Sequence, residues 1–268
     1  MRLVTYDRDG DRRLGAWVHD AVVDLPDAVG HPAFPATLEA LITRHRGTAL
    51  EAARAALANP SYVEEARVRS PRFLAPLALA GAERGRVLGP GEDVRWPEGT
   101  ACRWQPELAC VLGRSGRDLS PEAAWELVFG YLMVSTWSPG GDDGGDPSVA
   151  RLATTLGPCV VTAEDFDPCQ VTATARVNGG VWIRERMGDA ASRFAHTIAL
   201  ASREREVSAG EIFSSSPFDR PVPGGGAREL TRGATMELEA GVFGVLRNRL
   251  RFVKAVPRPE PVGAGRTR

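Results

Sequence analysis

The sequence contains very little lysine. Lys254 is the only lysine among the 33 Lys and Arg residues of this 268-residue chain. Arginine stays protonated in proteins, so it can act neither as a base nor as a Schiff-base amine. The composition therefore excludes a lysine-based mechanism unless Lys254 itself supplies the amine.

The sequence also lacks an excess of charge of one sign and long hydrophobic runs. The formal net charge is −1, so we expect neither nucleic acid nor an anionic membrane surface as a partner. No apolar run approaches the roughly 20 residues that span a bilayer. The polar opening MRLVTYDRDGDRR does not resemble a signal peptide, and a cytoplasmic location is expected.

Cysteines are few, and none forms a C-x-x-C pair or has a histidine close in sequence. This spacing excludes a zinc site of the usual kind. We expect all four to be small, mostly buried residues. They are Cys102, Cys110, Cys159 and Cys169.

The first third of the chain is predicted to combine strands and helices. Residues 1–25 have strand patterns with a hairpin signal at Asp9-Gly10. Residues 38–45 and 49–60 have helical spacing, and Pro60 is expected to close the second helix. Residues 81–99 are rich in Gly and Pro, which is typical of loops and turns.

The remainder is predicted to be mostly strands. A helix is expected from the N-cap Ser120 through Tyr131, and another over 192–204. Asn178-Gly179 predicts a tight hairpin. The fold class is therefore mainly β with peripheral helices (α+β). We expect a small N-terminal domain at 1–70, a larger domain at 71–256 and a flexible tail at 257–268.

The segment CRWQPELACVLG, residues 102–113, is predicted to be a strand that carries a polar pair. Gln105 and Glu107 lie two residues apart, so an extended chain points both to the same face. One is a carboxylate and the other is a neutral amide.

Several ordered segments resemble the fumarylacetoacetate hydrolase family. They are VLGPGEDVRWP, PELACVLGRSGRDLSPEAAWELVFGY, LGPCVVTAEDFDP, the VNGGV hairpin and LTRGATMELEAGVFGVLRNRL. The opening segment RLVTYDRDGDRRLGAWVHDAVVDL resembles the small first domain of that family. The resemblance implies a mixed β-roll with a small N-terminal domain, usually a homodimer.

The resemblance also implies chemistry. Members of the family typically hold Mg²⁺ or Mn²⁺ with three carboxylates, two from a Glu-x-Glu strand and one from an Asp on the strand after the VFGY-like segment. The ion chelates a 1,3-dicarbonyl or 2-oxo acid and stabilises an enolate during C–C cleavage, decarboxylation or tautomerisation. Here Gln105-Pro106-Glu107 occupies the Glu-x-Glu position, and Thr136 falls at the third ligand.

Two of the three carboxylates are therefore missing. Hard divalent ions are usually held by carboxylate oxygens, so we expect no tightly bound cofactor and at most weak Mg²⁺ or Mn²⁺ binding. If a metal site exists, its ligands are expected to be Glu107, Gln105 and Asp142, with the last in the GGDDGGDP run. The other interpretation of that run is a polar loop.

The predicted site combines the remaining polar and aromatic residues of these segments. Glu107 and Ser216 are the predicted catalytic residues, although Glu107 could also be a structural hydrogen-bond acceptor. The predicted substrate-binding residues are Gln105, Thr136, Ser138, Arg151, Trp104 and Trp137. For the two tryptophans, ordinary core packing is the alternative.

Three hypotheses for function follow. The first is an enzyme that acts on a β-dicarbonyl, enol or oxo acid by isomerisation, cyclisation or C–C cleavage without tight Mg²⁺, in a biosynthetic role. The second is a conventional Mg²⁺- or Mn²⁺-dependent hydrolase, decarboxylase or isomerase of the family. The third is a binding or scaffold protein without activity. The expected partners are a small-molecule substrate and a second copy of the chain.

Overall fold

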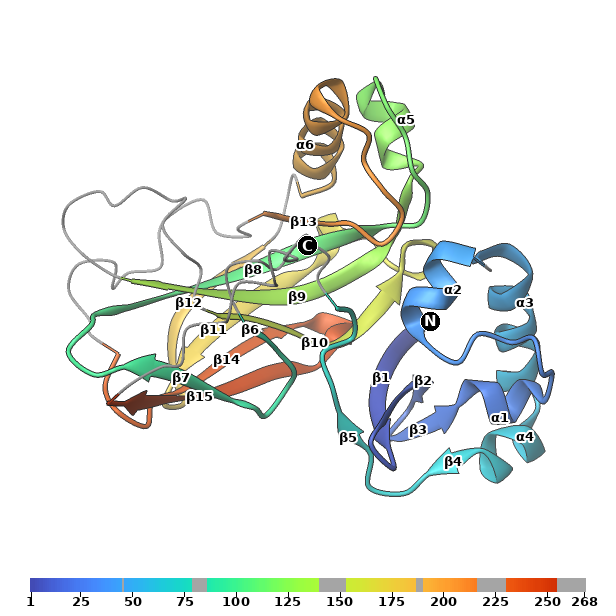
Figure 1. The fold of residues 1–268 in the computed structure, drawn as a ribbon, viewed down its shortest axis with the longest axis horizontal. Coiled ribbons are helices and arrows are strands. Elements are labelled where there is room, and N and C mark those ends of the chain that lie inside the picture. The colour runs from blue at the N-terminus through green and yellow to red at the C-terminus, as the bar shows by residue number, and fades with distance from the viewer. Residues whose placement is uncertain (45, 79–85, 140–152, 187–189, 216–229, 255–268) are drawn as a thin grey trace, which may run out of the picture.

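The protein consists mainly of two packed β-sheets. The computed structural model describes residues 1–44, 46–78, 86–139, 153–186, 190–215 and 230–254. Within these ranges one sheet has ten strands in the order β13-β8-β9-β10-β1-β2-β3-β4, with β5 on β1 and β6 on β10. The other has five strands in the order β12-β11-β14-β15-β7 (Figure 1). The predicted fold class is confirmed.

The strands of the ten-stranded sheet come from the whole length of the chain. They are β1 (Arg2–Arg8), β2 (Asp11–Val18), β3 (Ala21–Asp24), β4 (Arg67–Val68), β5 (Arg72–Phe73), β6 (Arg86–Leu88), β8 (Cys102–Leu112), β9 (Val128–Pro139), β10 (Ala153–Thr162) and β13 (Ile212–Ser215). The strands of the five-stranded sheet are β7 (Asp93–Pro97), β11 (Thr172–Val177), β12 (Gly180–Arg186), β14 (Thr235–Ala240) and β15 (Val245–Val253).

Helices lie at the periphery of the sheets (Figure 1). The α-helices are α1 (Leu25–Val29), α2 (Leu38–Arg44), α3 (Arg46–Leu57), α4 (Pro60–Glu65), α5 (Pro121–Trp125) and α6 (Ala190–Glu204). The described residues also form three short 3₁₀ helices, η1 (Ala163–Asp165), η2 (Pro168–Gln170) and η3 (Gly241–Phe243). None of the helices in these described ranges is both long and apolar enough to cross a membrane.

Local sequence signals set several turns and caps as predicted. Asn178 and Gly179 have φ values of 50° and 80°, the left-handed pair that a two-residue hairpin needs. Asp9 and Gly10 likewise have positive φ between β1 and β2. The Ser120 side chain accepts a hydrogen bond from the Ala123 N–H and caps α5.

Three predictions about elements are wrong. The helix that begins after Ser120 ends at Trp125, and the VFGY segment begins strand β9 instead. Pro60 opens α4 rather than closing the helix before it, because its ring suits the first turn of a helix. Residues 81–99, predicted to be loop, contain β6 and β7, which pair in parallel with β10 and β15.

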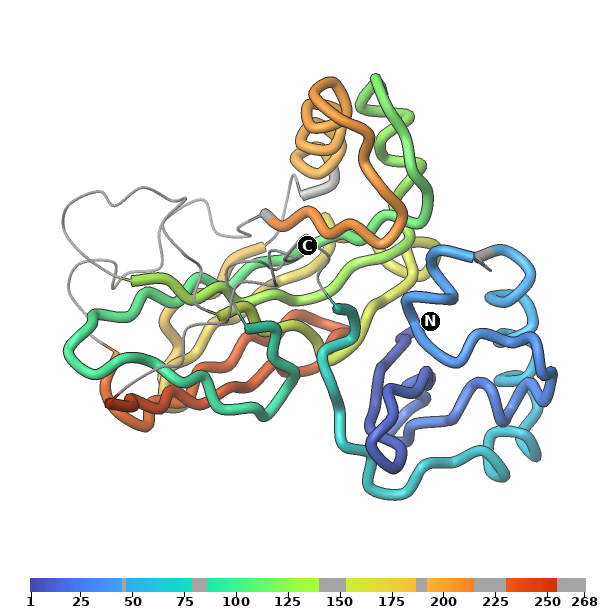
Figure 2. The backbone as a smooth tube through the Cα atoms, in the orientation of Figure 1, coloured from blue at the N-terminus to red at the C-terminus, as the bar shows by residue number. Residues whose placement is uncertain are grey.

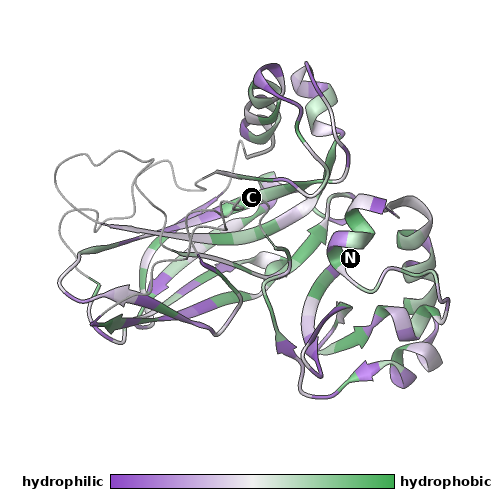
Figure 3. Ribbon diagram, viewed as in Figure 1, coloured by the Kyte–Doolittle hydropathy of each residue, from purple (hydrophilic) through white to green (hydrophobic). Residues whose placement is uncertain are grey.

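The main core fills the space between the two sheets. Leu108 and Met133 from the ten-stranded sheet pack with Leu238 and Leu250 from the five-stranded sheet in one buried cluster. In Figure 3 hydrophilic and hydrophobic bands alternate along the strands, as expected where one face of a strand is buried. We call the side of the ten-stranded sheet that faces this core its inner face.

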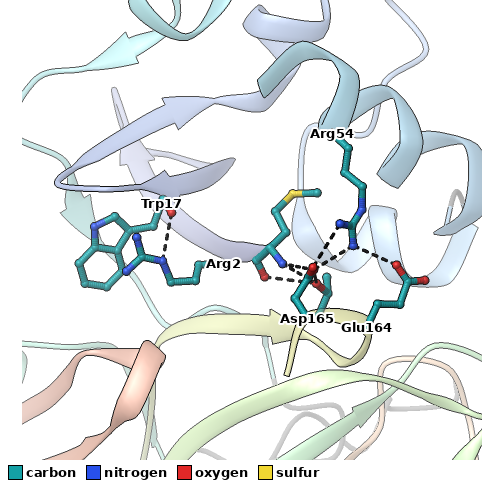
Figure 4. A network of polar contacts seen from close by, with 7 residues as sticks. Arg2, Trp17, Arg54, Glu164 and Asp165 are labelled. Atoms are coloured by element: carbon teal, nitrogen blue, oxygen red, sulfur yellow. Dashed lines mark hydrogen bonds and ion pairs between the residues drawn. The ribbon is translucent and has the colours of Figure 1, made fainter. Parts of the chain in front are cut away.

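The N-terminal region continues the ten-stranded sheet through the antiparallel pair of β1 and β10 (Figure 2). Arg54 of α3 also forms ion pairs with Glu164 and Asp165 of η1, at 2.9 Å each. Figure 4 shows this network and the Arg2 guanidinium 4.8 Å from the centre of the Trp17 ring. The independence of residues 1–70 as a domain stays a prediction.

The cysteines lie as free thiols and fit a packing role. Cys110 and Cys159 are buried, and Cys102 and Cys169 are partly buried. Burial raises the pKa of Cys102, Cys110 and Cys159 to about 12. Because the thiolate is the nucleophile, these three thiols are unsuited to catalysis at neutral pH.

Candidate functional site

The candidate site is built on three adjacent strands at the centre of the ten-stranded sheet. Strand β9 lies between β8 and β10 and pairs antiparallel with both. Gln105 pairs directly with Thr136, and Thr136 pairs with Thr154. Directly paired residues share a face, so this register brings three polar side chains into one row across the sheet.

This row lies on the side of the sheet opposite the inner face. We give the name polar face to the six residues at this end of that side, namely Arg103, Gln105 and Glu107 of β8, Thr136 and Ser138 of β9, and Thr154 of β10. Further along the same strands this side becomes apolar. There Ala109 and Leu132 pack in a second core cluster with Leu41 of α2. The polar residues therefore occupy one end of a face whose other end supports the fold.

Two motifs of the sequence hold these strands and their neighbours in place. A Cβ at Gly130 would lie 2.4 Å from the Val161 carbonyl oxygen, so only glycine lets β9 approach β10 this closely. The Asn248 side-chain amide donates to the Gly89 and Glu92 carbonyls at 3.0 Å each, which ties β15 to the turn before β7. The glycine of the VFGY segment and the asparagine of the VLRNRL segment thus each have a role in holding the backbone in place.

Glu107 is the buried carboxylate of the polar face. Its exposed fraction is 4%, and that of Thr136 is 5%. The Thr136 hydroxyl donates a hydrogen bond to Glu107 Oε1 at 3.1 Å. Among the described residues this is the only hydrogen bond that the Glu107 side chain makes, and no described cation forms an ion pair with it. A buried carboxylate normally needs more compensation than one neutral donor.

The other predicted residues of the polar face differ in exposure. Gln105 is exposed, and Ser138 is half-buried opposite Arg103. The structure thus brings Gln105, Glu107, Thr136 and Ser138 to one face, with Glu107 as the most enclosed. Ser216, Arg151 and Asp142 lie outside the described residues.

The prediction that Trp104 and Trp137 line the site is corrected by the structure. The two residues pair with each other across β8 and β9, and their ring centres are 6.2 Å apart. They belong to the core between the sheets, with exposed fractions of 5% and 0%. Each lies next to a residue of the polar face, and side chains alternate along a strand, so both point to the inner face.

Two residues of the polar face, Arg103 and Thr154, were not identified from the sequence, whereas the Ser214–Ser216 hydroxyls are predicted from it as possible substrate donors. Arg103 pairs with Ser138 and Thr154 pairs with Thr136, and Ser214 pairs with Ala109, which lies two positions from Glu107. Side chains two residues apart on a strand share a face, so the position of Arg103 two residues before Gln105 could have predicted its place. Thr154 reaches this side through the pairing of β9 with β10, which no local sequence pattern indicates.

The described donors do not fit a hard divalent cation. Glu107 is the one carboxylate among the described residues of the polar face, beside an amide and hydroxyls. Within the same ranges no three His, Cys, Asp or Glu side chains come together as a potential metal site. Mg²⁺ and Mn²⁺ prefer carboxylate oxygens, so the donor set is too poor in negative charge.

The sheet topology and the motifs together define a known class of fold. Residues 51–251 match the family described as Fumarylacetoacetate (FAA) hydrolase C-terminal. This match covers most of the chain, which therefore belongs to the fumarylacetoacetate hydrolase family.

Solved structures share this fold. Maleylpyruvate hydrolase from Sphingobium sp. SYK-6 superposes with a TM-score of 0.72 and 20% identity, over 94% of this chain and 100% of that chain. A second structure of that enzyme, in complex with manganese(II) and pyruvate, gives a TM-score of 0.70 and 19% identity over 94% and 99% of the two chains.

One curated relative matches a part of the chain. It is a mitochondrial oxaloacetate tautomerase of Xenopus laevis, 27% identical over 136 residues, which is 47% of this chain and 43% of the relative. The matched segment thus spans less than half of the length of either protein.

Proposed function

We propose that this protein is an enzyme that moves a proton at the carbon next to a carbonyl group in a small oxo acid or β-dicarbonyl compound. Glu107 is the acid–base group, and no tightly bound divalent ion takes part. The observation that carries the proposal is a buried carboxylate, on a polar face, whose single described hydrogen-bond partner is the neutral Thr136.

The chemistry of this carboxylate suits the proposal. A general base needs an accessible lone pair and freedom from a permanent ion pair. With one described bond at Oε1, the other oxygen, Oε2, has no described partner and can accept a proton. Isomerisation and cyclisation of such substrates need proton transfer to or from this carbon or its enol oxygen, and C–C cleavage releases an enolate that must take a proton there.

The relatives support the substrate class. The curated relative is a tautomerase of oxaloacetate, and a structure with the same fold holds pyruvate. Both compounds are 2-oxo acids that enolise. That structure also holds manganese(II), whereas the described donors around Glu107 here include two neutral groups, Gln105 and Thr136, at positions where the family resemblance implies carboxylates.

The test is the conversion of enol-oxaloacetate to the keto form, followed by ultraviolet absorbance in buffer with a chelator. We expect the wild-type protein to accelerate it and Glu107→Gln to lose the acceleration by about 10²–10⁴-fold, the usual contribution of a general base. Glu51→Gln, at an exposed position of α3, is the matched control and should behave as wild type. Full activity of Glu107→Gln would overturn the proposal.

A further inference from the structure

The hydrogen bond between Thr136 and Glu107 joins two central strands. Glu107 pairs with Val134 across β8 and β9, so Thr136 is its diagonal neighbour on the same face. The hydroxyl reaches Oε1 at 3.1 Å, and both side chains are more than nine-tenths buried. The contact is therefore shielded from bulk water. In such an interior a hydrogen bond is electrostatically stronger than in water, so it orients the carboxylate more firmly.

Thr136 is well suited to hold the Glu107 carboxylate in one orientation. Threonine is β-branched, so few χ1 rotamers are accessible to it on a strand. Its strand, β9, is paired on both sides by β8 and β10 and cannot shift without breaking two ladders. A rigid donor on one carboxylate oxygen fixes the plane of the carboxylate and thereby the direction of the lone pairs on the other oxygen.

A hydroxyl and a carboxylate would act differently at this position. The family resemblance implies an Asp here, which when ionised is only an acceptor and requires a cation between itself and Glu107. Threonine can donate directly to Glu107 and needs no such bridge. In the described geometry the Thr136 hydroxyl therefore orients the Glu107 carboxylate directly, with no ion between the two side chains.

We propose that Thr136 is a positioning residue, which holds Glu107 through Oε1 so that Oε2 exchanges the proton with the substrate. This inference rests on the proposed function. In the step, Oε2 takes the proton from the carbon next to the carbonyl. The C–H electron pair forms the C=C bond of the enolate, and the carbonyl π pair moves to oxygen. Return of the proton to that oxygen gives the enol, without any redox change.

The test compares Thr136→Val, which removes the hydroxyl at almost constant volume, with Thr136→Ser, which keeps it. We expect the valine variant to lose about 10–100-fold in kcat for oxaloacetate tautomerisation with little change in KM, since misplacement of a catalytic group by about 1 Å has effects of this size. The serine variant should stay within about threefold of wild type because its hydroxyl makes the same bond.

The matched control is Thr155→Val, one residue from Thr154 on the inner face. Its side chain is fully buried, and its hydroxyl has no hydrogen-bond partner among the described residues. The same change at Thr155 should leave kcat unaltered. If Thr136→Val does not fold, Thr136→Ala takes its place, with the same loss of kcat expected.

A crystal structure of each variant supplies a measurement independent of activity. We expect the Glu107 carboxylate to turn in Thr136→Val and to keep its orientation in Thr136→Ser. Wild-type kcat in the valine variant, equal losses in both variants, or an unmoved carboxylate in the valine variant would overturn the positioning role. An active Glu107→Gln variant would instead overturn the proposed function, so the two failures are distinct.

Discussion

Two buried carboxylates of this protein have very different surroundings. Asp24, at the end of β3, has an exposed fraction of 2%, and Glu107 has 4%. Asp24 accepts hydrogen bonds from Tyr6 at 2.5 Å, from Arg13 at 2.8 Å and from Arg8 at 3.0 Å. Glu107 accepts one described bond, from the neutral Thr136 at 3.1 Å.

The difference indicates which carboxylate serves the fold. Burial alone would raise the pKa of Asp24, but hydrogen bonds from Arg13, Tyr6 and the Asp27 N–H outweigh it and lower that pKa. A charge compensated this fully is an integral part of the structure. Glu107 has no such compensation among the described residues, and a buried polar group with so few partners calls for an explanation such as a catalytic role. Four measurements test this difference between Asp24 and Glu107.

The largest expected effect on stability is from Asp24→Asn. The change removes the negative charge that Arg8 and Arg13 share and leaves them with Asp27 alone. Both arginines are partly exposed, so no unpaired charge is left buried. Hydrogen bonds to charged groups contribute about 1.5–3 kcal/mol, and we expect a loss of this size in urea unfolding. Asp20→Asn, at a position with a 90% exposed side chain, should change stability by less than about 0.5 kcal/mol. Equal effects of the two changes would contradict the contrast.

The next effect is the creation of a metal site on the polar face. Gln105→Glu with Thr136→Asp would place three carboxylates on neighbouring positions of β8 and β9. We expect the double variant to bind Mg²⁺ at least about 100-fold more tightly than wild type, equivalent to about 2.7 kcal/mol. Isothermal calorimetry measures it, with Gln105→Glu alone as an intermediate. Absence of binding in the double variant would show that the assignment of positions 105 and 136 is wrong.

A third, smaller effect is a loss of stability in acid. The pKa of Asp24 is lowered, and so is that of Asp165, because hydrogen bonds from Arg54 and the amino terminus outweigh the effect of burial on Asp165. A folded-state pKa below the unfolded value of about 3.9 contributes stability that is complete above about pH 5 and is lost as the pH falls. The urea midpoint should therefore decrease from pH 5 to pH 2. Asp24→Asn should flatten this slope, and an unchanged slope would argue against the lowered pKa.

The smallest effect on stability is expected from Glu107→Gln. Glutamine has nearly the same shape, its carbonyl oxygen can accept the Thr136 bond, and no described cation loses a partner. Neutralising an uncompensated buried charge should leave the free energy of unfolding within about 1 kcal/mol of wild type or raise it. A loss comparable to that of Asp24→Asn would make Glu107 a structural residue.

The sequence predicted those features that short segments determine. The Asn178-Gly179 hairpin and the Ser120 cap depend on a few adjacent residues, and the structure confirms both. The VFGY segment has apolar spacing compatible with a helix. Its strand conformation comes from pairing with β8 and β10, which are distant in the chain. Tertiary pairing overrode local preference there.

For the site, alternation along one strand was enough to place Gln105 and Glu107 together. The same rule, applied to Trp104, would have assigned it to the core, where the structure has it. Thr136 was expected to bind substrate, and its bond to Glu107 could not be predicted because it depends on the register of two strands. The role of Thr136 toward Glu107 could be inferred only once the structure had placed both side chains.

In the proposed function Glu107 acts without a divalent ion. The most direct measurement is a calorimetric titration of chelator-stripped wild-type protein with Mg²⁺ and with Mn²⁺. We expect no binding up to about 1 mM of either ion, since the described donors include one carboxylate. Micromolar binding would contradict it, because ligands beyond the described residues would then complete a metal site.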